Sequence, residues 1–306
     1  MKDDFIRPFQ IESPGIRGRL VRLGPTIDEI LNQHNYPLAV GRLLGEALAL
    51  VAVIAGASKF EGTFTLQIKG DGLIPLLLAD FRSPGNLRGY ARFREKELTL
   101  KVNSPDDLSI TNLFGVGVAA FTIDPDGKTD RHQGIVSLEG ESLADCANKY
   151  FRESEQTDTK IILMSNNVED MSGSKSWRAG AIMIQRLPGD RRDSAVTGRR
   201  FEIDSVGEES WRRAVLLLDS VSEKELLNHK LNGDKLLYKI YHEEGVRVFD
   251  GTDLVAECAC SKGRAENVFR SLPTEDLADL CIEGKLEMTC EFCNKIYNFP
   301  LETLKN

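Results

Sequence analysis

Cys258-Ala-Cys260 is followed, after 29 intervening residues, by Cys290-Glu-Phe-Cys293, so two close cysteine pairs lie near the end of the sequence. Each pair can span one edge of a tetrahedron of ligands, and the fold has only to bring the two pairs together. Four sulfur donors suit Zn²⁺ best, with an iron–sulfur cluster as the second occupant that they allow. The pattern therefore predicts one zinc ion bound by Cys258, Cys260, Cys290 and Cys293.

The segment around these pairs is too small to depend on apolar contacts alone. We place a small C-terminal zinc domain at residues 249–306, and a domain of this size buries little apolar surface. Structural zinc contributes about 10–16 kcal/mol to the folding of such a domain. We therefore expect its fold to depend on the metal. A site closed by four thiolates leaves no position for a catalytic water, so we expect no enzymatic activity.

The four thiolates can serve structural support or redox sensing. Thiolate is the oxidisable form of cysteine, and exposed clusters react first. Oxidation would remove the ligands, and with them the main source of stability of residues 249–306. The two remaining cysteines belong to neither pair. We expect Cys146 to be a core thiol and Cys281 to be a small buried residue, with a mixed disulfide as the alternative for Cys281.

Composition limits the partners of the chain. The 306 residues carry a formal net charge of -8, and residues 250–306 alone hold eleven acidic and six basic side chains. Such a balance disfavours binding to nucleic acid or to an anionic membrane surface. The first residues show no secretory leader, and clustered free cysteines suit a reducing compartment, so we expect a cytoplasmic protein.

An apolar stretch over residues 36–57 imitates a membrane span. Its uninterrupted apolar part runs only from Ala47 to Ala57, which is too short to cross a bilayer. Arg42 and Glu46 stand at positions i and i+4, where they can pair on one face of a helix. We therefore predict a buried core helix.

The sequence predicts an α+β protein. Residues 1–188 form an N-terminal mixed α/β domain with antiparallel sheets, because alternating segments are separated by tight turns. Residues 189–248 form a helical linker, which begins with a charge-rich, flexible boundary near Pro188. The expected strands of the first domain are Ile16–Leu23, Phe64–Ile68, Leu73–Phe81, Leu87–Phe93, Leu98–Val102, Val116–Ile123, Ile135–Leu138 and Ala181–Leu187, and its later helix is Leu143–Glu155.

Several stretches, in this order along the chain, are shared with one family. They are Gln133-Gly-Ile-Val136, Leu138-Glu-Gly-Glu-Ser-Leu143, Tyr150-Phe151, Ser154-Glu-Gln156, Ala181-Ile-Met-Ile-Gln-Arg-Leu-Pro188, Leu237-Tyr-Lys-Ile-Tyr-His-Glu-Glu244 and Ser271-Leu-Pro273. With the CxC and CxxC pairs at their long spacing, the chain resembles the redox-regulated heat-shock holdase chaperones of the 33-kilodalton type over nearly its whole length.

The resemblance implies a mechanism. In this family the reduced, zinc-bound form is inactive. Oxidation forms one disulfide within each close pair, which here means Cys258–Cys260 and Cys290–Cys293. Zinc then leaves, the C-terminal domain unfolds and the linker loosens. The exposed surface holds unfolding client proteins without ATP, and the active form is a homodimer.

Two other classes remain open from the residues themselves. One is a zinc-dependent interaction or regulatory module that binds a partner, nucleic acid included, whatever its redox state. The other is a thiol–disulfide oxidoreductase that uses Cys290 and Cys293. That motif belongs near a βαβ pattern, and the segment around it is too short for one.

Overall fold

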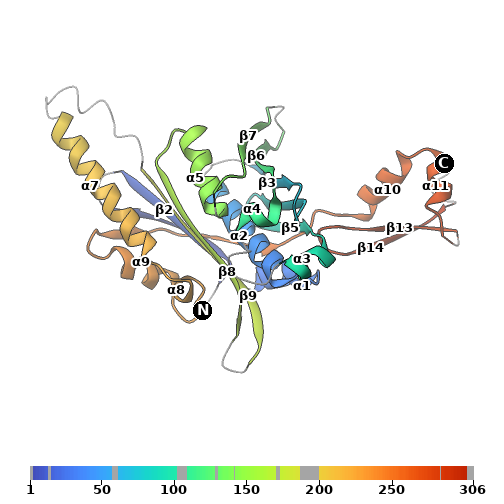
Figure 1. The fold of residues 1–306 in the computed structure, drawn as a ribbon, viewed down its shortest axis with the longest axis horizontal. Helices are drawn as coiled ribbons and strands as arrows, with labels where there is room; N and C mark the ends of the chain where they lie inside the picture. The colour runs from blue at the N-terminus through green and yellow to red at the C-terminus, as the bar shows by residue number, and fades with distance from the viewer. Residues whose placement is uncertain are drawn as a thin grey trace. The chain divides into compact units, whose positions relative to one another are not determined.

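The computed structural model describes residues 3–12, 15–56, 61–101, 109–127, 130–140, 142–169, 173–186, 200–282 and 284–301 (Figure 1). The chain divides into two compact units, Met1–Ala256 and Glu257–Asn306. The predicted flexible boundary near Pro188 falls on residues 187–199, which lie outside the described residues. From residue 200 the chain is helical.

The first unit contains two sheets. The first sheet has the strand order β10-β1-β2-β9-β8, with β11 paired to β1, and all of these pairs are antiparallel. Side chains on β2 alternate between the two faces, so Val21 and Leu23 enter one core while Ile16 and Leu20 enter another. The strands are β1 (Phe5–Ile11), β2 (Ile16–Leu23), β8 (Thr159–Glu169), β9 (Lys175–Arg186), β10 (Val246–Val248) and β11 (Thr252–Asp253).

The second sheet has the order β12-β5-β4-β3-β6-β7 and is antiparallel except for the β12–β5 pair. Short strands from residues 246–256 thus add to both sheets, which is why the first unit extends to Ala256. The strands are β3 (Gly62–Gly70), β4 (Leu76–Arg82), β5 (Asn86–Arg92), β6 (Gly117–Pro125), β7 (His132–Ser137) and β12 (Val255–Ala256).

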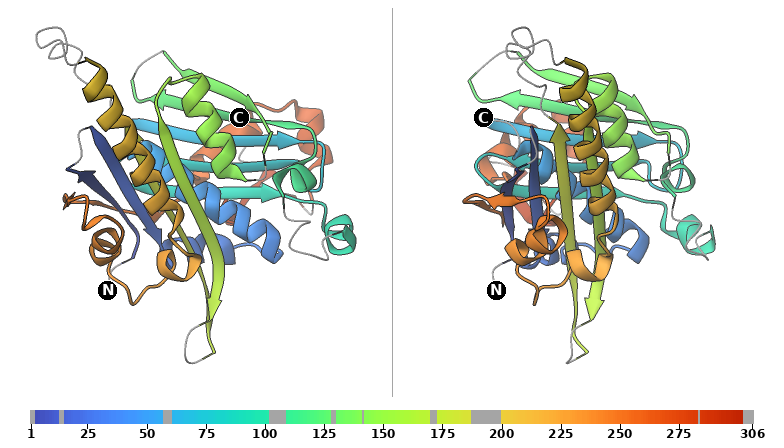
Figure 2. Two further views of the ribbon diagram at one scale, coloured as in Figure 1. Left: turned by 60° about the vertical axis from the view of Figure 1, so that its left-hand side comes forward. Right: turned by 90° about the vertical axis from the view of Figure 1, so that its left-hand side faces the viewer.

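Helix α2 (Leu38–Ala55) packs against strands of both sheets and forms the centre of the main core (Figure 2). It is long and apolar enough to cross a membrane by length and composition, but 83% of it is buried inside the structure. The predicted buried core helix is therefore confirmed. Arg42 forms its ion pair with Glu223, at 3.3 Å, instead of with Glu46.

The shorter helices of the first unit complete the main core. Helix α5 begins at a capping box, in which Ser142 and Asp145 satisfy each other's backbone N–H groups. The prediction of a strand at Leu98–Val102 is wrong over its described part: residues 95–101 are helical, Leu98 is buried in the main core, and acidic residues occupy the first turn, while Val102 lies outside the described residues. These helices are α1 (Pro25–Asn32), α3 (Glu95–Lys101), α4 (Ile110–Phe114) and α5 (Leu143–Glu153).

The predicted helical linker forms α7 (Arg200–Asp219), α8 (Glu223–Leu226) and α9 (Gly233–Tyr241). In Figure 1 these helices lie on the side of the first sheet opposite α2. Apolar side chains from the helices and from that face of the sheet form a second core. The linker helices therefore cover an apolar sheet face.

The second unit is small. It contains helices α10 (Lys262–Arg270) and α11 (Thr274–Asp279) and a hairpin of β13 (Lys285–Thr289) and β14 (Ile296–Pro300). Its buried core, in the described part of the unit, comprises Ala265, Phe269, Leu277, Leu286, Tyr297 and Phe299. The α+β fold class with antiparallel sheets and a C-terminal four-cysteine cluster is confirmed.

Candidate metal centre

Two turns present the four paired cysteines. Cys258 and Cys260 lie in the segment before α10, whose first turn is capped by the Ser261 hydroxyl. Cys290 and Cys293 lie in the turn between β13 and β14. The Cys290 N–H donates to the Lys295 carbonyl at 2.9 Å, and the Asn294 N–H donates to the Cys290 carbonyl at 2.8 Å.

Asn294 closes this second turn with a φ of 53°. Asparagine tolerates this left-handed conformation better than most residues. The tight turn places the sulfurs of Cys290 and Cys293 within 4.8 Å of each other.

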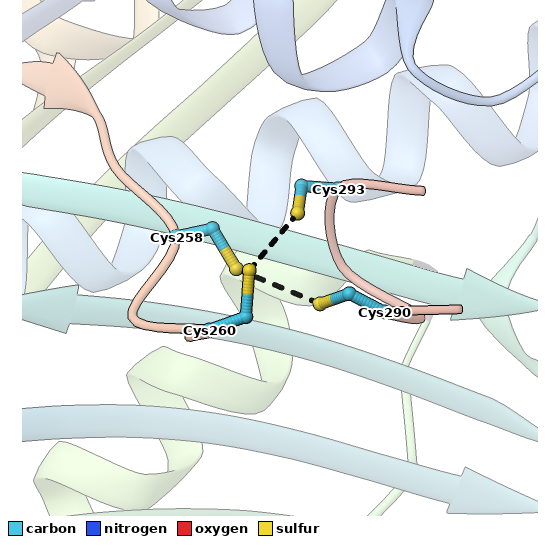
Figure 3. A group of neighbouring side chains, drawn as sticks. All are labelled: Cys258, Cys260, Cys290 and Cys293. Atoms are coloured by element: carbon cyan, nitrogen blue, oxygen red, sulfur yellow. Dashed lines mark hydrogen bonds between the residues drawn. The ribbon is translucent and has the colours of Figure 1, made fainter. Parts of the chain in front are cut away.

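The four sulfur atoms converge (Figure 3). All lie within 4.8 Å of one another. The Cys258 and Cys290 sulfurs are 3.7 Å apart, and those of Cys260 and Cys293 are 3.4 Å apart. A tetrahedral site with Zn–S bonds of about 2.3 Å places its sulfurs roughly 3.8 Å apart. The four half-buried residues therefore have the spacing and the donor atoms to hold a metal ion.

The electrostatics of the cluster also favour a cation. Burial raises the pKa of Cys258 and the pKa of Cys293. Burial alone would also raise the pKa of Cys260, but hydrogen bonds from Tyr297 and from the other cysteines lower it to about 7. Four thiolates this close repel one another, so all four become charged together only when a positive ion balances them.

Tyr297 is a site residue that the sequence analysis missed. Its hydroxyl donates a hydrogen bond to the Cys260 sulfur at 3.2 Å. That hydrogen bond raises the pKa of Tyr297 to about 12. Tyr297 stands four residues after Cys293, and its place beside the cluster depends on the hairpin register Met288↔Tyr297.

The other two cysteines lie outside the cluster. Cys146 is buried in the main core, and burial raises the pKa of its thiol to about 11, which confirms the predicted core thiol. Cys281 is half-buried and packs against the small core of the second unit. It is less buried than expected, and its neighbours Leu280 and Ile282 are exposed.

Together these features define a two-unit α+β protein whose smaller unit carries a four-cysteine site suited to a metal. A family model described as "Hsp33 protein" matches residues 4–300. The chain belongs to the Hsp33 family of 33 kDa chaperones, and the family resemblance inferred from its motifs is confirmed.

Named relatives agree with this assignment. A 33 kDa chaperonin of Caulobacter vibrioides is 38% identical over 296 residues, which cover 96% of this chain and 94% of the relative. One from Pseudomonas fluorescens is 35% identical over 298 residues, covering 97% and 90%. The crystal structure of the 33 kDa chaperonin of Thermotoga maritima shares the fold, with a TM-score of 0.79 at 22% identity, over 99% of this chain and 97% of that one.

Proposed function

We propose that this chain is a redox-regulated, ATP-independent holdase that binds unfolding client proteins under oxidative stress. The observation that carries the proposal is the four-sulfur cluster in a small, separate unit. We propose zinc as the metal, one ion per chain, because four thiolates at these separations suit it best. Cys258, Cys260, Cys290 and Cys293 would hold the ion, which would keep their sulfurs deprotonated and tie the Cys258–Cys260 turn to the β13–β14 hairpin.

Oxidation would remove the ligands in pairs. We propose the disulfides Cys258–Cys260 and Cys290–Cys293. In each, two thiolates lose two electrons to the O–O bond of hydrogen peroxide, which takes up two protons and leaves as two water molecules. Because the buried core of the second unit is small, loss of the metal should unfold that unit.

The linker helices supply a latent binding surface in this scheme. Helices α7 to α9 cover an apolar face of the first sheet. Loosening of these helices would expose side chains that attract unfolded proteins. The covered sheet residues are Phe5, Phe9, Ile11, Ile16, Leu20, Ile182 and Ile184.

We further propose that the protein is cytoplasmic, has no enzymatic activity and forms a homodimer when oxidised. Free clustered thiols persist in a reducing compartment. The net charge of -8 supports partners other than nucleic acid and membranes.

The test is light scattering of a chemically unfolded client without ATP. Peroxide-oxidised protein should suppress aggregation, and reduced, zinc-loaded protein should not. Cys281→Ser is the matched control, because it removes a thiol of the same unit that lies outside the cluster, and it should switch like the wild type. Equal suppression by the reduced and oxidised forms would refute redox regulation, and suppression by neither would leave a metal-binding interaction module.

A further inference from the structure

Tyr297 links the two halves of the cysteine cluster. It lies on β14, in the hairpin that carries Cys290 and Cys293, whereas its hydroxyl bonds to Cys260 of the preceding turn. Only 8% of the residue is exposed, and its ring belongs to the small core. The Lys295 ammonium group lies 5.5 Å from the centre of that ring. The small core and this contact hold the ring, and the hydroxyl at its end lies beside Cys260.

Core packing alone does not explain a tyrosine here. Phe299, two residues further along the same face of β14, is 2% exposed and packs edge-on against Phe269 with ring centres 5.5 Å apart. The Lys262 ammonium group lies 5.6 Å from the Phe299 ring. Phe299 thus shares with Tyr297 a place in the small core and an ammonium group near its ring, and it needs no hydroxyl for either. What distinguishes Tyr297 is the hydrogen bond to sulfur.

A hydroxyl that donates to a thiolate has two effects. When the metal already keeps the sulfur deprotonated, the hydrogen bond draws electron density from it, so the sulfur reacts more slowly with electrophiles. It also fixes the direction of the sulfur lone pairs, as outer groups around metal ligands commonly do. We propose that Tyr297 is a positioning residue of the metal site, which orients the Cys260 sulfur toward the other three and lowers its reactivity. This inference rests on the metal site of the proposed function.

Tyr297→Phe tests the inference because it removes only the hydroxyl. The full-length, zinc-saturated protein is treated with iodoacetamide, and the modification rate of each cysteine is followed by mass spectrometry. The ratio of the Cys260 rate to the Cys258 rate should rise several-fold in the variant. Zinc affinity, measured by competition with a chromogenic chelator, should fall about tenfold, as is typical when an outer-shell partner is lost.

Phe299→Leu is the matched control, since it weakens the same core without touching sulfur. It should change the four cysteine rates together and leave the Cys260 to Cys258 ratio as in the wild type. Replacing Tyr297 by 3-fluorotyrosine, a stronger hydrogen-bond donor, should lower that ratio.

An unchanged ratio in Tyr297→Phe would overturn the inference. So would a uniform acceleration of all four cysteines, because that is the signature of a purely structural role. A wild-type protein that binds no zinc would instead overturn the proposed function.

Discussion

Arg22→Met should release the α8–α9 segment while leaving the central layers of the fold intact. The Arg22 guanidinium is buried on the linker side of β2. Its Nη1 donates to the carbonyls of Asn228, at 3.0 Å, and Leu231, and its Nη2 donates to the carbonyl of Glu225 at 2.9 Å. One side chain thus holds the end of α8 and the loop that follows it.

The size of the effect follows from these bonds. Each hydrogen bond contributes about 1 kcal/mol net, so the three are worth roughly 3 kcal/mol. The charged guanidinium of Arg22 is costly to bury, which is why burial lowers its pKa, and removing it recovers part of the loss. A net loss of about 2 kcal/mol corresponds to roughly 30-fold faster local opening.

Native-state hydrogen exchange measures that opening directly. Amides of residues 223–241 should exchange about 30-fold faster in Arg22→Met, while those of β3 and β4 keep their protection. Arg19→Met is the control, because Arg19 is a half-buried arginine of the same strand β2 but donates to the Gly56 carbonyl at the end of α2, at 2.9 Å. Unchanged exchange in residues 223–241 of Arg22→Met, or equal acceleration by Arg19→Met, would refute the reasoning.

Three further predictions concern single titratable or sulfur-bearing side chains. Cys290→Ser should lower zinc affinity and loosen the β13–β14 hairpin in reducing buffer, whereas Cys281→Ser should keep full zinc content by elemental analysis; zinc loss in the latter would revise the ligand set. Burial raises the pKa of the Glu46 carboxyl from a usual 4.5 to about 8, because the folded protein favours its protonated form. The stability that this form contributes is fully present below about pH 4.5 and is lost as the pH rises through about 8. Glu46→Gln should therefore flatten the fall of the thermal midpoint across that range. A pH profile parallel to that of the wild type would contradict the raised pKa of Glu46. Cys146 should resist iodoacetamide in the folded protein near neutral pH, since its pKa is about 11, and modification as fast as that of Cys281 would show that its helix opens readily.

Local patterns predicted much of the fold. Helix α2 is recognisable because its apolar residues continue around the whole helix, as a fully buried helix requires. The strand β2 was predicted with its observed limits, because basic and apolar residues alternate along it. The five-residue pattern at Leu98–Val102 is too short to distinguish the periodicity of a strand from that of a helix, and it was wrongly predicted as a strand.

Other parts depend on contacts that no local pattern shows. The strand β1 was missed because Pro8 stands in its middle, where proline argues against a strand. The strand β8 was missed because its apolar residues Ile161–Met164 form one short continuous run without alternation, and polar residues follow it. The pairing of residues 246–256 with β1 and β5 joins segments far apart in the sequence.

The candidate site also has a part that the sequence could predict and a part that it could not. The four cysteines were identified from spacing alone, and the structure brings their sulfur atoms together. Tyr297 could not be identified, because its hydroxyl reaches Cys260 only through the register of the hairpin and the approach of the preceding turn. The spacing of residues in the sequence can indicate ligands that lie within one turn. The groups that support those ligands are brought to them by the tertiary fold, so local spacing cannot indicate them.

The most direct test of the account follows zinc release and client protection together during a single oxidation. Reduced, zinc-loaded protein is treated with peroxide, a chromogenic chelator reports free zinc, and samples taken over time are assayed for suppression of aggregation without ATP. The account predicts release of about one zinc per chain, as one four-thiolate site requires, with suppression rising in step and disappearing after reduction with added zinc. Full suppression before any zinc is released, or release without suppression, would contradict it.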